Sequence, residues 1–147
     1  MAKTHHFKGF SIVKGDIKVK IKFSRFERQF AEAQYWFDGQ IMTDMTVYMP
    51  KNTNMFIDLT RGKSAAVQGT GIVYAAIPPS GRFLYEGLVM VDPVTNSPWA
   101  RKGAKKVVTD RPLNYSNPKA VSHWFDKSKE VKGESWVKGV KRRAGGG

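Results

Sequence analysis

The stretch "KAVSHWFDKSKEVKGESWVKGVKRR", residues 119–143, decides how this chain folds, because it combines strong positive charge with large aromatic side chains. In a loose basic arm the rings of Trp124, Phe125 and Trp136 would be exposed to water, although such rings are stabilised by burial. Apolar and small residues recur here at steps of three to five, which brings them to one side of a helix. They are Ala120, Trp124, Ser128, Val131, Trp136 and Val140. The stretch therefore predicts a docked C-terminal helix with a basic outer face.

A longer helix is predicted near the N-terminus, over about residues 25–48. Ser24 and Glu27 fit a capping box at its start, and Pro50 ends it. One apolar stripe follows helical spacing through Phe26, Phe30, Ala33, Phe37 and Ile41. We expect this stripe to pack on a sheet and to form the core with the C-terminal helix. The predicted core residues are Phe26, Phe30, Phe37, Ile41, Trp124 and Phe125.

Short strands are predicted on both sides of this helix. Residues 17–23, "IKVKIKF", alternate strictly between apolar side chains and lysines, which is typical of a half-buried strand. The runs at 55–60, 64–70 and 71–77 also resemble strands, with Arg61-Gly62-Lys63 as a hairpin turn. Residues 80–87 suit a single helical turn. The expected fold is α+β, with the long N-terminal helix packed on a small, mostly antiparallel sheet.

Residues 88–117 predict a long basic loop, with a β-ribbon formed by "LVMV" and "KKVVT". A loop of this length inside a compact domain is commonly functional. Its cations have Trp99 and Tyr115 nearby, and we take its candidate interface residues as Trp99, Arg101, Lys102, Lys105, Lys106 and Arg111. Such a cluster can grip a phosphate chain while bases stack on the aromatic rings, or it can dock on an acidic protein surface. A plain solvated loop is the third interpretation.

The charge of the chain points to an anionic partner. The 25 Lys and Arg residues outnumber the 12 Asp and Glu residues, for a net charge of +13. Residues 97–147 hold 13 of the cations and only 4 of the acidic residues. A C-terminal third so charged suits nucleic acid, an acidic protein surface or a membrane face. No apolar run reaches the roughly 20 residues of a membrane helix, so we expect no membrane partner.

No enzyme motif is complete in this sequence. The "RGKS" at 61–64 lacks the earlier glycine of a phosphate-binding loop, since position 57 is Ile57. The "GTG" at 69–71 lacks the third glycine of a dinucleotide site. There is no cysteine, and His123 stands alone as a packed or solvent-facing residue. We expect no catalytic residue, no metal and no cofactor.

We divide the chain into a flexible segment at 1–16, a single α+β domain at 17–143 and a glycine tail at 144–147. The domain includes the basic loop at 88–117.

Four segments in order resemble the neck, or tail-completion, proteins of tailed bacteriophages, which are often labelled minor capsid proteins. "KVKIKFSRFERQF" (18–30) is similar to the opening of that family, and "YMPKNTNMFIDLTRGKS" (48–64) stands where the family has Pro and then Thr-Gly. "PSGRFLYEG" (79–87) and "NPKAVSHWFDKSK" (117–129) resemble two further segments, and 86–108 resembles an insertion of one branch. The resemblance spans about residues 17–143. Asn54 departs from the pattern, replacing the glycine after Thr53.

The resemblance implies a structural virion protein and no catalysis. Such a subunit forms a ring at the head–tail neck, commonly a hexamer, with a dodecamer as the alternative. Its partners are a portal-side connector or stopper protein and a tail terminator or tail tube protein, and DNA passes through its lumen. It is made in the host bacterial cytoplasm and resides in the virion. The other hypothesis is a free-standing basic nucleic-acid-binding module.

Overall fold

The structure is a computed structural model that describes residues 10–14, 17–21, 24–51, 54–78 and 81–146. In chain order its elements are β1 (Phe10–Lys14), β2 (Ile17–Ile21), α1 (Ser24–Met45), the 3-10 helix η1 (Thr46–Tyr48), α2 (Met55–Ala65), α3 (Gly81–Glu86), β3 (Leu88–Val91), β4 (Val107–Pro112) and α4 (Trp124–Arg143). The long N-terminal helix, the small antiparallel sheets and the C-terminal helix confirm the predicted α+β class. Phe23 and Thr53, which carried two sequence predictions, lie outside the described residues.

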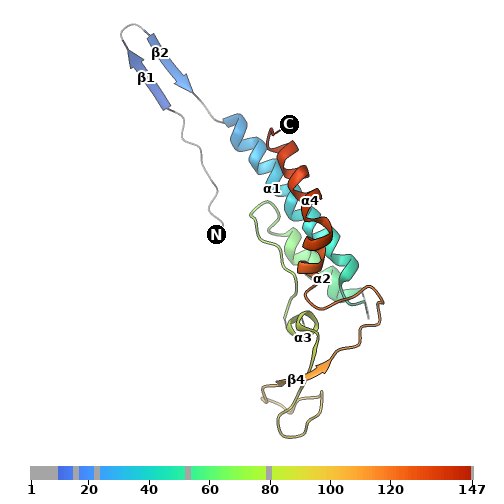
Figure 1. Ribbon diagram of the computed structural model, residues 1–147. Coiled ribbons are helices and arrows are strands. Elements are labelled where there is room, and N and C mark those ends of the chain that lie inside the picture. Colours follow the sequence, from blue (N-terminus) through green and yellow to red (C-terminus); the bar gives the residue numbers. More distant parts are fainter. Residues whose placement is uncertain (1–9, 15–16, 22–23, 52–53, 79–80, 147) are drawn as a thin grey trace.

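The helices α1 and α4 form an antiparallel pair that organises the molecule (Figure 1). Trp136 of α4 is buried and donates its indole N–H to a carboxylate oxygen of Asp44 at 2.7 Å. At Gly139 the helices approach so closely that an added Cβ would lie 2.0 Å from the Trp36 ring. Near the C-terminal end of α4, the Arg143 guanidinium lies 4.0 Å from the centre of the same ring. The aromatic side of the C-terminal stretch is thus docked, as the sequence predicts.

The core lies where the start of α4 meets η1 and α2. Its fully buried members are Met45, Met49 and Trp124, and Ile57 of α2 completes the cluster. The Trp124 indole N–H donates to the carbonyl of Ala75 at 2.8 Å, so burial of this ring leaves its polar atom satisfied. Helix α4 begins only at Trp124, later than the helical spacing of the sequence indicates.

Helix α2 overturns the predicted strand at residues 55–60 and the predicted hairpin turn at Arg61-Gly62-Lys63. The buried residues of α2 are Ile57, Thr60 and Ser64, spaced three and four apart. Two of these three are polar, so the helical period is invisible to a reading of hydrophobicity. The Thr60 hydroxyl donates to the Phe56 carbonyl at 2.7 Å, and the Tyr74 N–H donates to the Ser64 hydroxyl at 2.9 Å. The predicted strand at 71–77 is irregular chain.

Two separate hairpins contain all the strands that the described residues form. Strands β3 and β4 pair with an irregularity between Leu88 and Met90, which confirms the predicted ribbon. Strands β1 and β2 pair Phe10 with Ile21 and Ile12 with Val19. Residues 10–14, which we placed in a flexible segment, therefore form a strand, while residues 1–9 lie outside the described part of the chain. Figure 1 shows this hairpin beyond the N-terminal end of α1.

The apolar stripe of α1 packs on α4 rather than on a sheet, which corrects one predicted contact. Ile41 is buried, and Phe37 meets Trp136 edge-on with ring centres 6.1 Å apart. Phe125 stacks on Trp136 with ring centres 6.3 Å apart. In contrast, Phe26 and Phe30 remain 50% and 47% exposed, so they do not belong to the core predicted for them. The stripe is thus buried at Ala33 and Ile41, half-buried at Phe37 and exposed at Phe26 and Phe30.

None of the helices in the described part of the chain combines the length and apolar character needed to cross a membrane.

Candidate partner-binding surface

The loop between β3 and β4 is held in one shape by the carboxylate of Asp92. Asp92 is fully buried at the end of β3, and its two oxygens accept hydrogen bonds from the backbone N–H groups of Val94, Thr95 and Arg101. The Arg101 guanidinium completes the set, with Nε 2.9 Å from one oxygen and Nη2 3.3 Å from the other. A charged, bidentate pair of this kind fixes geometry as well as charge. The loop is therefore rigidly fastened to the sheet.

The electrostatics of Asp92 follow from these contacts. The Arg101 guanidinium, and then the backbone N–H groups of Val94 and Arg101, hold the pKa of the Asp92 carboxyl well below its ordinary value of 3.8. The same pairing raises the pKa of Arg101. Both groups are charged over the whole physiological range, so the loop keeps its shape across that range.

The Asp92 loop presents Trp99 to solvent. Trp99 is 86% exposed, and Val94 on the same loop is 69% exposed. The Trp99 backbone N–H donates to the Ser97 hydroxyl at 3.1 Å, which fixes the backbone that carries the ring. A large aromatic side chain held in water on a rigid support is typical of a binding anchor, because little conformational entropy remains to be lost on association.

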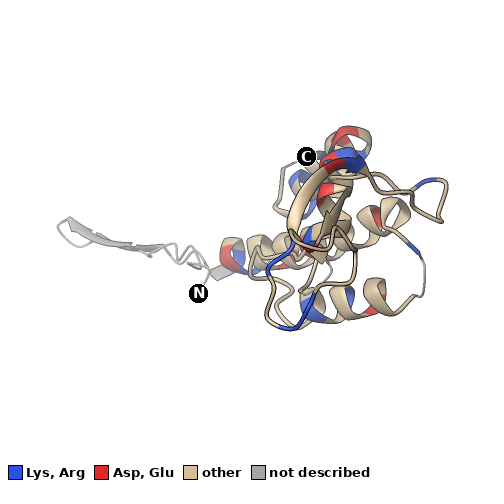
Figure 2. Ribbon diagram, turned by 90° about the horizontal axis from the view of Figure 1, so that it is seen from below, with Lys and Arg blue, Asp and Glu red and all other residues tan. Residues whose placement is uncertain are grey.

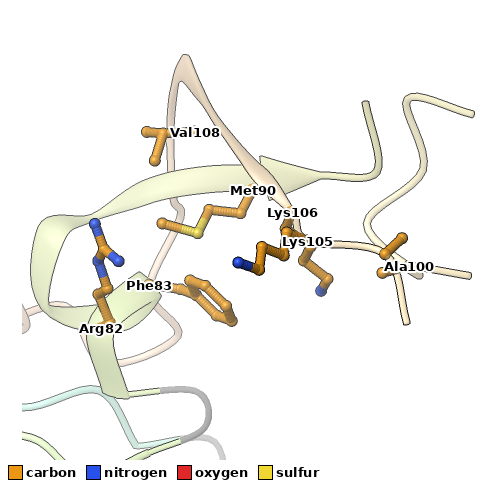
Figure 3. A pocket seen from close by; sticks show the side chains of 8 residues that line it. Arg82, Phe83, Met90, Ala100, Lys105, Lys106 and Val108 are labelled. Carbon is orange, nitrogen blue, oxygen red and sulfur yellow. The ribbon is translucent and has the colours of Figure 1, made fainter. Parts of the chain in front are cut away.

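A shallow groove lies beside this loop, between α3 and the β3–β4 hairpin (Figure 3). Its volume is about 700 Å³. The apolar lining comes from Phe83, Met90, Ala100, Ala104 and Val108. The cationic lining comes from Arg82, Lys105 and Lys106, and the Lys106 ammonium lies 5.4 Å from the centre of the Phe83 ring. We call this the α3–β4 groove.

The structure divides the predicted interface residues into three groups. Arg101 belongs to the fold through Asp92, although 55% of its side chain stays exposed. Lys105 and Lys106 line the α3–β4 groove. Trp99, Lys102 and Arg111 are exposed away from it. Figure 2 shows Lys and Arg segments on the loops at this end of the molecule.

Tyr115, which the sequence placed near the cluster, does not offer a free ring. Its hydroxyl donates to the Leu84 carbonyl at 2.5 Å, and the same oxygen lies 2.9 Å from where a Cβ on Gly87 would stand. Burial raises the pKa of the Tyr115 phenol. Gly87 has a φ of +70°, so its backbone and this close approach both require glycine. Tyr115 anchors the base of the ribbon.

The motif fragments of the sequence also have structural roles. Gly69 and Gly71 both have positive φ, and their N–H groups donate to the buried carboxylate of Asp38 at 2.7 and 3.0 Å. The "GTG" therefore forms a turn tied to α1. His123, just before α4, packs edge-on against Tyr85 and lies 3.3 Å from a carboxylate oxygen of Glu86, while about half of its side chain faces solvent.

Sequence reasoning missed three contributors to this surface. Asp92 was overlooked because its role depends on Arg101, nine positions later. Arg82 and Phe83 were assigned to an isolated helical turn, and only the packing of α3 on β3 brings them to the loop. The signal that could have found Asp92 is "DPVTN" (92–96), an acidic residue at a turn followed by free backbone N–H groups.

Among the described residues, no group of His, Cys, Asp and Glu side chains is arranged to hold a metal ion. Comparison with known proteins adds no relative: no family model, no curated protein and no solved structure matches this chain.

Proposed function

We propose that this chain is a structural subunit of the neck of a tailed bacteriophage, in which copies form a ring that joins the portal-side connector or stopper to the tail terminator or tail tube. The proposal starts from the four ordered segments that resemble the neck-protein family. The observation that carries it is Trp99, which is 86% exposed on a loop that is fastened by Asp92 and also carries several lysines. A rigid, exposed aromatic anchor suits permanent docking of one virion protein on another.

The β1–β2 hairpin supports assembly into a ring. A two-stranded hairpin by itself is marginally stable in water, so contact with a neighbouring subunit would stabilise it. Its pairs run antiparallel from Phe10–Ile21 to Lys14–Ile17, and no third strand of the described chain joins them. A contact made by an arm on a different surface of the next copy is heterologous, and such contacts form a ring when the rotation between copies closes.

The test begins with the purified full-length chain. We expect rings in negative-stain images and a mass several times that of the 16.5 kDa subunit in light scattering. In a phage that encodes the chain, replacing Trp99 by alanine is expected to leave heads and tails unjoined while the subunit still folds. The proposal would be overturned if the purified protein stayed monomeric and the chain were also absent from the necks of assembled virions.

The second candidate is a nucleic-acid-binding module, which the exposed cations Lys102, Lys105 and Arg111 favour. The two functions differ in their dependence on salt. DNA affinity that rests on phosphate contacts falls by about a thousandfold or more between 50 and 200 mM salt when six to ten contacts are made. We expect weak DNA binding at 150 mM salt for a neck subunit, because a lumen that grips DNA would hinder its passage. Submicromolar affinity that disappears when the loop cations are neutralised would favour the second candidate.

A further inference from the structure

We infer that the α3–β4 groove binds an acidic segment of a different protein, with one apolar side chain seated on Phe83 and Met90 and its carboxylates beside Arg82 and Lys105. This deepens the proposed function, since it names the class of partner for one part of the same surface. The groove combines an apolar floor with a cationic rim (Figure 3). Apolar contact gives affinity to such a site, and the charges select the partner.

The floor of the groove is preformed. Met90 lies on β3 and is 7% exposed. The strand is fixed to β4 by a hydrogen bond of 2.7 Å that the Thr109 hydroxyl donates to the Val89 carbonyl. Ala100 is fixed because its neighbour Arg101 is bound to Asp92 through both backbone and side chain. An occupant therefore meets a site that requires little reorganisation.

The rim of the groove selects an anion. Lys105 is exposed, and Lys106 lies over the Phe83 ring, where its charge faces the groove. The residues that line the groove include no Asp or Glu. A carboxylate placed among three cations gains complementary charge, whereas a basic or neutral segment does not.

A second copy of this chain is a poor occupant. Of the acidic groups that the structure describes, Asp38, Asp44 and Asp92 accept hydrogen bonds within the fold. Glu130 pairs with Lys127, while Glu86 and Asp126 flank His123. The others are Glu27 and Glu32 on α1, Asp58 on α2, Asp110 on β4 and Glu134 on α4. Asp126, Glu130 and Glu134 recur at steps of four on α4, but lysines alternate with them along the helix, so the described chain offers a face of mixed charge rather than an acidic segment.

Nucleic acid fits the groove less well than an acidic peptide does. Base stacking needs an open aromatic face. Phe83 is the aromatic residue of the groove, and Lys106 already lies over its ring. The neighbouring Trp99 ring is open, so nucleic acid stays an outcome that the experiment must separate.

The experiment uses the full chain at 150 mM salt and a fluorescein-labelled peptide with a central leucine between aspartates. Two matched probes accompany it: the same peptide with serine for leucine, and a labelled oligothymidylate of equal charge. Fluorescence anisotropy gives each affinity. We expect the leucine peptide to bind about tenfold more tightly than the serine peptide, because only it fills the apolar floor.

Two pairs of variants locate the binding. Lys105→Glu is expected to lower the affinity for the leucine peptide by about tenfold. Lys102→Glu, which lies outside the groove, is expected to lower it by less than about threefold. Val108→Ser removes a groove methyl pair, whereas Val107→Ser changes its neighbour on β4, which lies outside the groove. These valines are 49% and 45% exposed, so the two variants perturb folding to a similar extent. If both valine variants unfold, the comparison of the two lysine variants still shows whether the peptide binds in the groove.

Equal effects of Lys102→Glu and Lys105→Glu would overturn the groove as the site, as would equal affinity for the leucine and serine peptides. Tighter binding of the oligothymidylate would assign the surface to nucleic acid. Self-association that competes with the peptide would assign the groove to a second copy. None of these outcomes depends on ring formation, so absence of rings would count against the proposed function and leave this inference standing.

Discussion

Trp124 and Trp99 are both tryptophans, but one is buried in the core and the other is exposed to solvent. Trp124 is fully buried between α2 and α3, and its indole N–H is bonded to the Ala75 carbonyl. Trp99 is 86% exposed, and in the described part of the chain its indole N–H has no hydrogen-bond partner. The helical body uses aromatic rings to hold itself together, whereas the β3–β4 loop uses backbone and ionic bonds for that purpose and leaves its ring outside. The difference is the basis of the proposal that Trp99 contacts another molecule.

The largest expected effect is on the buried side of this comparison. Trp124→Ala should lower the free energy of unfolding by about 3–5 kcal/mol, since it removes a fully packed ring and leaves the Ala75 carbonyl without its donor. Urea denaturation followed by circular dichroism measures it. Trp124→Phe, which keeps much of the ring, serves as the control and should cost clearly less. A loss below about 1 kcal/mol would show that the core is not centred on this residue.

A smaller effect is expected where α1 and α4 touch. Gly139→Ala should cost about 1–3 kcal/mol, because its Cβ would stand 2.0 Å from the Trp36 ring. Gly133→Ala is the matched control on the same helix, since its Cβ would have only Lys129 Cγ nearby, at 3.8 Å. That change should stabilise the protein by up to about 1 kcal/mol through helix propensity. Thermal unfolding compares the two, and the same sign for both would contradict the close approach.

The shape of the loop should depend on pH only in strongly acidic solution. Because the folded pKa of Asp92 is depressed, its contribution is fully present above the ordinary value of 3.8 and is lost as the pH falls below it. We expect the NMR signals of the Val94 N–H and the Arg101 Nε–H to shift only in that acidic window. Asp92→Asn should reproduce the loosened loop at pH 7. Signals that move between pH 5 and 8 would point to another group.

The smallest effect on stability is expected for Trp99 itself. Trp99→Ala should change the free energy of unfolding by no more than about 0.5 kcal/mol, because the ring makes few contacts within the chain. The same variant should abolish joining of neck partners in a complementation assay. A large destabilisation would show that Trp99 serves the fold after all, and would remove the basis of the comparison.

The sequence predicts the parts of this fold whose apolar residues follow a single period. The α1 stripe, the ribbon of β3 and β4 and the aromatic face of α4 were all visible in this way. Helix α2 was not, because Thr60 and Ser64 are buried through hydrogen bonds rather than through hydrophobicity. The exposure of Phe26 and Phe30 was also unpredictable, since nothing in their spacing tells how far α4 extends along α1.

The sequence predicts which residues belong to the candidate surface, but it does not predict how they are placed relative to one another. Trp99 and its cations were identified together, yet the sequence could not separate Arg101, which serves the loop, from Lys105, which lines the groove. That division depends on which backbone N–H groups converge on Asp92. It also depends on the packing of α3, which brings Phe83 under Lys106. Both are tertiary facts that local patterns do not contain.

The pairing of α1 with α4 has a consequence for the order of events during synthesis. Asp44 and its partner Trp136 are 92 residues apart in the chain. At roughly 5–20 residues per second, α1 leaves the ribosome about 5–18 s before the helix that covers it. For that interval the stripe from Ala33 to Ile41 has no native cover, and the nascent chain depends on chaperones or on speed to avoid aggregation. Because the covering helix follows α1 by so many residues, the α1–α4 core forms only after α4 has been synthesised.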